Sequence, residues 1–343
     1  MGKNVLILHH DDRDGFMSAA VIKYYLTSNK SSQFSDLAII TKSINYEQPI
    51  KEIFNQCLLS LKKEKTHEDD FSKVYLVDYS ISNEQNEKGI LEINEKYDLI
   101  WIDHHASSIQ CVLKNTELNK IKGMRIVGLS GAALCWLFYH KDIQMFCERL
   151  KDYENNVDGV SKSFALSILE EADTPIFVLY THRYDIFDLN DTVLQFNYGY
   201  TDLDVDKMLE HIDPKYQNYD LDEFEFAVKT GDTIKKYVDN QNKILVKGYG
   251  VEATFKDGER TYRCLTLNNP VFTSLVYGAV IGDYDFVVSY ARKQKVWRYS
   301  LYTVKDDINV SDIARKYDGG GHPKAAGFTS DKPLWEYKEW EFD

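Results

Sequence analysis

Short apolar runs in the first third of the chain alternate with segments of helical spacing. The runs cover residues 5–8, 74–77 and 99–102, and each has the length of a buried β-strand. Between them, residues 15–26 and 83–96 carry apolar side chains three or four positions apart, which is typical of amphipathic helices. Strands that alternate with helices predict an α/β fold with a mostly parallel sheet flanked by helices.

The later pattern predicts more helices and then a second group of strands. Residues 131–212 are mainly of helical spacing, notably 131–140 and 205–211, and residues 222–246 predict one long charged helix. Beyond it, the pattern predicts four strands at residues 251–255, 260–265, 286–290 and 296–303. It also predicts two helices, at residues 271–280 and 310–317.

These changes of pattern predict a division into domains. A chain of 343 residues exceeds what one hydrophobic core usually supports. We therefore predict an N-terminal domain over residues 1–215, a linker helix over 216–247 and a smaller C-terminal α/β domain over 248–343.

Composition narrows the class of protein. The chain is 43% hydrophobic and 28% charged, as ordinary globular proteins are, and its net charge of −13 argues against a protein that coats long duplex nucleic acid. Five cysteines without a CxxC pair indicate reduced thiols. Neither a signal peptide nor an apolar run of membrane-spanning length is evident. We therefore expect a soluble cytoplasmic protein without a membrane partner.

The ends of the three apolar runs carry candidate metal ligands. His10, Asp12 and Asp14 follow the first run, and an extended backbone would place them on one face. Asp78 ends the second run, and Asp103-His104 ends the third. Since parallel strands present their carboxyl ends at one edge of a sheet, these side chains should converge. Imidazole and carboxylate groups together suit Mn²⁺ or Mg²⁺.

Each of these segments has an ordinary structural alternative. The sequence HHDDRD is also typical of a polar turn where a strand meets a helix, with Gly15 permitting the turn. An aspartate such as Asp78 after a strand usually caps a helix. Metal binding is favoured because three strand ends carry ligands at once, and because Asp103-His104-His105 has little structural purpose at a strand terminus.

These motifs resemble those of the DHH phosphoesterases. The HxDxDG opening, the strand-ending Asp78 and the Asp-His-His triplet are similar to motifs I to III of that family. The motif IV candidate is Asp185 in HRYDIFDL, with Asp188 as its competitor. Within the superfamily the whole chain is most similar to the nanoRNase B-type oligoribonucleases.

A second signature resembles the associated DHHA1 substrate-binding domain. It is the GGGHPKAAG segment, in which the candidate substrate-binding residues are Gly319, Gly320, Gly321 and His322. We expect this glycine-rich segment to be a loop, in which consecutive glycines allow backbone N–H groups to approach a phosphate. The chain departs from the family pattern at Tyr302, where an arginine is common; its substitutes could be Arg298, Arg292 or Lys324.

The resemblance implies two metal sites for Mn²⁺ or Mg²⁺. His10 and Asp12 would bind one ion, Asp14, His104 and Asp185 the other, with Asp78 shared between them. The resemblance also implies catalytic roles beside the metals. Asp103 would orient the neighbouring histidines, and His105 would contact the scissile phosphate or protonate the leaving oxygen.

The implied activity is hydrolysis of short single-stranded RNA to mononucleotides. The same motifs serve enzymes that hydrolyse cyclic dinucleotides, pApA or 3′-phosphoadenosine 5′-phosphate, so a small nucleotide is the alternative substrate. A nucleotide-binding regulatory protein on the same fold is the alternative that is not an enzyme. The sequence does not decide between a monomer and a homodimer. Histidines without a motif, among them His182 three residues before Asp185, are expected to be structural.

Overall fold

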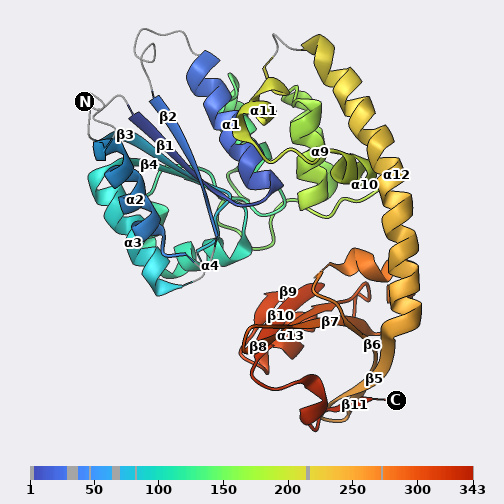
Figure 1. Cartoon of the computed structure of the whole chain (residues 1–343). Helices are drawn as coiled ribbons and strands as arrows, with labels where there is room; N and C mark the ends of the chain where they lie inside the picture. Colours follow the sequence, from blue (N-terminus) through green and yellow to red (C-terminus); the bar gives the residue numbers. More distant parts are fainter. Residues whose placement is uncertain are drawn as a thin grey trace. The chain divides into compact units, whose positions relative to one another are not determined.

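The computed structural model describes residues 4–28, 38–45, 48–63, 70–81, 83–213, 217–271 and 273–342. The chain divides into two compact units, Met1–Asp232 and Thr233–Asp343 (Figure 1). The division falls inside α12 (Gln217–Tyr249), the long helix that the sequence predicted. The predicted start of this linker at residue 216 lies outside the described residues.

The N-terminal unit contains a parallel sheet of four strands in the order β2-β1-β3-β4. Three strands form where apolar runs predicted them, and their bounds are Asn4–His10 for β1, Phe71–Val77 for β3 and Asp98–Ile102 for β4. The pattern did not reveal the edge strand β2 (Ala38–Ile44), because it is only partly buried and contains the polar residues Thr41, Lys42 and Ser43.

Helices cover both faces of this sheet (Figure 1). Along β1, Val5 and Ile7 point into one core and Leu6 and Leu8 into another, as the alternation of a strand requires. The helices that contribute to the first core include α1 (Arg13–Ser28) and α6 (Gly131–Tyr139). Those that contribute to the second are α2 (Ile50–Lys63), α3 (Glu84–Lys96), α4 (Ala106–Lys114) and α5 (Thr116–Asn119).

The rest of the N-terminal unit is helical, as predicted. Its helices are α7 (Ile143–Leu150), α8 (Lys162–Glu171), α9 (Ile176–Asp185), α10 (Asp191–Gly199) and α11 (Val205–Glu210). Helices α10 and α12 approach closely at two glycines. A Cβ atom on Gly199 would lie 1.8 Å from the carbonyl oxygen of Ala227, and one on Gly231 would lie 1.7 Å from that of Gln195.

The C-terminal unit contains a seven-stranded mixed sheet in the order β11-β5-β6-β7-β8-β10-β9. Only β6 and β7 pair in parallel. The strands are β5 (Gly250–Asp257), β6 (Arg260–Asn268), β7 (Phe286–Lys293), β8 (Val296–Tyr302), β9 (Gly320–His322), β10 (Ala325–Ser330) and β11 (Trp340–Phe342). The four strands predicted here are confirmed.

Two expectations for this unit need correction. The helix predicted over residues 271–280 is instead a kinked 3-10 segment, η2 (Ser274–Asp283), since Gly278 has a φ of 52° that an α-helix cannot hold. Phe272 in that range lies outside the described residues. The glycine-rich segment was expected to be a loop, but it forms the short strand β9 paired with β10. The predicted helix over 310–317 is confirmed as α13 (Val310–Arg315).

The predicted fold class is confirmed: an α/β unit with a parallel sheet flanked by helices, followed by a smaller unit with a mixed sheet. Among the helices of the described residues, none is both long and apolar enough to cross a lipid bilayer.

Candidate metal centre

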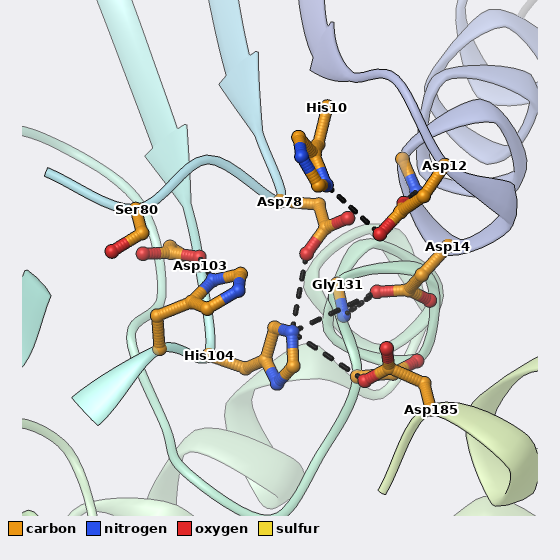
Figure 2. A network of polar contacts seen from close by, with 12 residues as sticks. His10, Asp12, Asp14, Asp78, Ser80, Asp103, His104, Gly131 and Asp185 are labelled. Carbon is orange, nitrogen blue, oxygen red and sulfur yellow. Dashed lines mark hydrogen bonds and ion pairs between the residues drawn. The ribbon is translucent and has the colours of Figure 1, made fainter. Parts of the chain in front are cut away.

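Acidic and histidine side chains converge at the carboxyl ends of β1, β3 and β4 (Figure 2). Three overlapping groups of ligand atoms each lie within 4.8 Å of one another. The groups are His10 with Asp12 and Asp78, Asp14 with His104 and Asp185, and Asp78 with His104 and His105. The first two contain the two ligand sets that the family resemblance implied, and Asp78 and His104 each belong to two groups.

The first group is built on the turn between β1 and α1. His10 Nδ1 lies 2.8 Å from Asp12 Oδ2, while Asp12 Oδ1 accepts a hydrogen bond of 2.9 Å from the Gly15 N–H. Burial opposes ionisation of Asp12, but the hydrogen bond and charge of His10 outweigh it and lower the pKa to about 2. Asp12 thus caps α1 with one oxygen and presents the other to His10.

Glycine is required at the start of α1 for space. A Cβ atom on Gly15 would lie 2.2 Å from the carbonyl oxygen of His10. The expectation that Gly15 permits a sharp turn is therefore incomplete, because what the position needs is close approach of the helix to the end of β1.

Asp14 reaches the cluster from a helix. The extended backbone expected over residues 10–14 is wrong, because β1 ends at His10 and α1 begins at Arg13. Asp14 accepts hydrogen bonds of 2.6 Å from the Gly131 N–H and 3.1 Å from the Ala132 N–H. It therefore spans from the first turn of α1 to the N-terminus of α6. Burial and the Asp185 charge nevertheless raise its pKa to about 7.

His104 is surrounded by three carboxylates. Its Nε2 atom lies 3.1 Å from Asp78, 3.5 Å from Asp185 and 4.0 Å from Asp14 (Figure 2). Burial disfavours the imidazolium, but the charges of Asp185 and Asp14 outweigh it and raise the pKa of His104. A cation in the place of this proton would satisfy the same carboxylates.

Asp78 is the most constrained member of the cluster. It is 1% exposed, and its backbone has a φ of 52°, a conformation that costs free energy for residues other than glycine and that asparagine and aspartate tolerate best. Burial and the neighbouring charge of Asp14 raise its pKa well above the usual range.

The donor atoms of this cluster fit divalent metals. Within the described part of the chain, both oxygens of Asp78 and one of Asp185 are buried and form no hydrogen bond of acceptable geometry, although His104 Nε2 lies 3.1 Å from Asp78 and 3.5 Å from Asp185. Buried carboxylates in that state are costly unless a cation neutralises them. Carboxylate oxygens with imidazole nitrogens are the donors that Mn²⁺ accepts, and Mg²⁺ accepts the oxygens.

The three residues of the Asp-His-His triplet make different contacts. Asp103 is 0% exposed and accepts a hydrogen bond of 2.7 Å from His105 Nδ1. Burial opposes its ionisation, yet the charge of His105 outweighs that and lowers its pKa. Asp103 was expected to orient both histidines, and the contact observed is with His105, which leaves His105 Nε2 as the ring nitrogen not bonded to Asp103.

The motif IV alternatives occupy different surroundings. Asp185, the last residue of α9, lies in the cluster with His104. Asp188 accepts a hydrogen bond of 2.7 Å from Arg183 Nε in an ion pair. Of the two, the structure brings Asp185 to the candidate metal centre.

Two further residues lie near the cluster: Gly131, which was not singled out from the sequence, and His182, which was expected to be structural. A Cβ atom on Gly131 would lie 2.7 Å from the Asp78 Cβ and 2.9 Å from an Asp14 oxygen, so this position has no room for a side chain. His182 is fully buried and its Nδ1 accepts the Ser130 N–H at 3.1 Å, at the start of α6. Burial lowers its pKa to about 3, so the ring is neutral and anchors that helix. Neither residue lies in a sequence motif, because the role of each depends on contacts formed only in the tertiary fold.

The predicted substrate-binding residues lie in the C-terminal unit. Gly320, Gly321 and His322 form β9, while Gly319 donates a backbone hydrogen bond of 3.0 Å to Ala314 beside it. Gly321 has a φ of 140°, and a Cβ atom on Gly319 would lie 2.3 Å from the carbonyl oxygen of Gly327. These two glycines are therefore required by the hairpin itself, whatever the segment binds.

The three substitutes for the arginine expected at Tyr302 differ in position. Arg298 lies on the same face of β8 as Tyr302, since the two are four residues apart. Lys324 pairs with Asp306 at 3.0 Å. Arg292 is near the β7–β8 turn and faces Trp297 across the strands, on the opposite face from Tyr302. Arg298 is thus the best placed of the three.

Comparison with known proteins finds a family match for the N-terminal part of the chain. Residues 4–151 match the DHH family, N-terminal domain. An uncharacterised protein of Acanthamoeba polyphaga mimivirus is 23% identical over 335 residues, which cover 94% of this chain and 66% of that protein. The chain thus spans just under two thirds of the length of that relative.

Two solved structures match most of this chain. One is a DHH domain described as a member of the s1p family of ribosomal proteins, with 12% identity and a TM-score of 0.55, covering 94% of this chain and 82% of that chain. Another is exonuclease RecJ bound to manganese, with 14% identity and a TM-score of 0.47, covering 97% and 87%. The first of these similarities shows a shared fold.

Proposed function

We propose that this protein is a metal-dependent phosphoesterase that hydrolyses short oligoribonucleotides to mononucleotides. The observation that carries the proposal is the cluster at the sheet edge, where Asp78 and His104 are shared between groups of ligand atoms that could each hold a cation. Buried carboxylate oxygens that form no hydrogen bond of acceptable geometry within the described residues favour metal binding over a structural role. The DHH-family domain over residues 4–151 supports phosphoester chemistry.

Two Mn²⁺ or Mg²⁺ ions would be held by side chains that the fold already brings together. His10 and Asp12 would bind one ion, Asp14, His104 and Asp185 the other, and Asp78 both. When bound, such ions activate water and stabilise charge on phosphoryl oxygens.

The protein's own groups contribute orientation and proton transfer. The Gly131 and Ala132 N–H groups fix the Asp14 carboxylate, and the left-handed backbone of Asp78 aims its side chain at both groups of ligands. Asp103 holds His105 through Nδ1, so that Nε2 can contact a phosphoryl oxygen or donate a proton to the leaving oxygen. These contacts precede substrate binding, so little reorganisation is needed at reaction.

Short substrates suit the charge of the molecule. A net charge of −13 disfavours long polyanions, whereas a small site neutralised by cations accepts an anionic ligand locally. In the C-terminal unit, the glycine hairpin with His322 and Arg298 is the proposed contact for the remote part of the substrate.

The test is Mn²⁺-dependent hydrolysis of end-labelled RNA from the dinucleotide upwards. Cyclic di-AMP, pApA, 3′-phosphoadenosine 5′-phosphate and single-stranded DNA would be assayed in parallel. Fastest turnover on the shortest RNAs is the expected result, and the position of the retained label fixes the attacked end. Preference for a small nucleotide would replace the substrate and keep the metal chemistry. Binding of nucleotides without turnover of any of them would identify a regulatory protein instead.

A further inference from the structure

Three aromatic side chains lie together on the C-terminal sheet and its flanking segment. Tyr290 is on β7, Trp297 is on β8, and Trp335 is in the 3-10 segment η3 (Leu334–Glu336). The ring centroids are 5.5 Å apart for Trp297 and Trp335, 6.1 Å for Tyr290 and Trp297, and 6.2 Å for Tyr290 and Trp335. We call Tyr290, Trp297 and Trp335 the aromatic patch.

At the aromatic patch, the side chains on this face of the sheet change from buried to partly exposed. In the same row as Tyr290, Tyr299 and Phe328 stack at 4.6 Å and are buried. Within the patch, Tyr290 and Trp297 are half-buried and Trp335 is 54% exposed. An exposed tryptophan backed by two half-buried rings forms a platform that costs free energy in water unless a ligand covers it.

Cationic side chains lie on the hairpin that carries this platform, with Arg292 on the platform's face and Lys293 and Arg298 on the opposite face. Arg292 faces Trp297 directly across β7 and β8, so that their side chains share one face. The stretch 290–298 contains four cationic and no acidic residues: Arg292, Lys293, Lys295 and Arg298. All four are exposed, and neither Arg292 nor Lys295 enters an ion pair with any residue that the structure describes.

This charge departs from the rest of the chain. The net charge of the protein is −13, whereas every charged residue of the β7–β8 hairpin is cationic. The neighbouring stretch 331–338 is balanced, with Asp331 and Glu336 opposed by Lys332 and Lys338. The hairpin therefore presents a local positive field beside exposed rings, which an anionic and aromatic ligand would match.

We infer that the aromatic patch and the β7–β8 hairpin bind single-stranded nucleic acid. Bases stack on Trp335 and Trp297, and phosphates contact Arg292 on the same face and Lys295 in the turn. A purely apolar partner would gain nothing from the cations, and inorganic phosphate would gain nothing from the rings. Stacking platforms beside cationic side chains are how proteins hold single strands without regard to sequence, whereas a duplex hides its base faces.

The inference concerns the C-terminal unit alone and does not require the N-terminal site to be an enzyme. It adds a contact surface on the opposite face of β8 from Arg298 and Tyr302.

Fluorescence polarisation of labelled oligouridylate tests the inference in the full chain, with EDTA present to prevent hydrolysis. A length of about 12 nucleotides falls within the range of single-strand sites. Trp335→Ala should weaken binding roughly tenfold, the effect of removing one base–aromatic stack. Arg292→Gln should reduce the slope of log Kd against log salt by about 0.7, the value for one phosphate contact to a single strand.

The matched control is Tyr237→Ala, which removes a 65% exposed aromatic side chain from α12 and should leave binding unchanged. Wild-type affinity in Trp335→Ala, or equal weakening by Tyr237→Ala, would overturn the inference. So would a wild-type chain that binds no oligouridylate but forms a dimer in sedimentation that Trp335→Ala disrupts. Oligouridylate binding that depends on Trp335, without Mn²⁺-dependent turnover of any RNA, would retain this inference and remove the proposed function alone.

Discussion

At the scale of single residues, Asp78 combines an energetically unfavourable conformation and environment with a central position in the candidate metal centre. It is buried, its backbone is left-handed, and it lies between His104 and the His10–Asp12 pair. Strain and buried charge at one position are retained in proteins where function requires them. Asparagine tolerates the same backbone conformation and removes only the charge.

Asp78→Asn should therefore reduce Mn²⁺-dependent turnover of an RNA dinucleotide roughly 100- to 1,000-fold, the scale of losing one preorganised electrostatic group. The metal-free variant should be at least as stable as the wild type, because one of several mutually repelling carboxylates is gone. Initial rates and thermal melts in EDTA measure the two effects.

Asp188→Asn is the matched control, since it removes a carboxylate that pairs with Arg183 outside the cluster. Its turnover should stay within a few-fold of the wild type. Near-normal turnover in folded, metal-loaded Asp78→Asn would contradict the shared-ligand assignment.

Gly131 makes a second prediction at this scale. A methyl group there would press on Asp78 and Asp14, so Gly131→Ala should displace both carboxylates. Mn²⁺ affinity should fall roughly 10- to 100-fold, as when groups that orient metal ligands are disturbed. Isothermal titration calorimetry checks this against Gly282→Ala, whose Cβ atom would meet nothing within 4 Å. Equal affinities in the two variants would show that the carboxylates can move aside.

The ligand residues could be predicted because strand ends in a parallel sheet coincide, which makes His10, Asp78 and His104 neighbours without further information. The argument for Asp14 rested on the wrong local geometry, since α1 starts earlier than the pattern suggested. The need for glycine at position 131 could not be predicted, because it depends on two side chains that are distant in sequence, Asp14 and Asp78.

At the scale of elements, the crossing of α10 and α12 depends on the absence of side chains at Gly199 and Gly231. Gly231→Ala should lower the free energy of unfolding by roughly 1–3 kcal/mol, because a methyl group has no room at this contact. Gly248→Ala, in the same helix with open space around it, should instead stabilise by about 0.4–1 kcal/mol. Urea denaturation followed by circular dichroism compares the two. Destabilisation of equal size in both would indicate that the crossing is loosely packed.

Elements were predictable where burial was complete and less so at edges. β1, β3 and β4 gave apolar runs, whereas β2 lies at the sheet edge and mixes polar with apolar residues. The glycine-rich segment carries no strand-forming side chains, so its pairing as β9 follows from its partner β10 rather than from its own pattern.

At the scale of the whole molecule, the carboxylate cluster links metal binding to stability. Burial and mutual repulsion raise the pKa values of Asp14, Asp78 and Asp185, so their ionised forms destabilise the metal-free fold. Mn²⁺ at about 100 times its Kd should stabilise the protein by about 2.7 kcal/mol per site. Thermal melts should show a rise in midpoint that EDTA reverses and that is smaller in Asp78→Asn. An unchanged midpoint in the wild type would argue against a metal centre here.

The most direct test of the central claim is Mn²⁺ titration of metal-stripped protein during hydrolysis of an RNA dinucleotide. Activity should be absent in EDTA, rise with Mn²⁺ and saturate at two equivalents per chain, with Asp78→Asn roughly 100- to 1,000-fold slower throughout. Turnover that persists in EDTA, or a wild-type protein that binds Mn²⁺ and hydrolyses no phosphoester, would contradict the account.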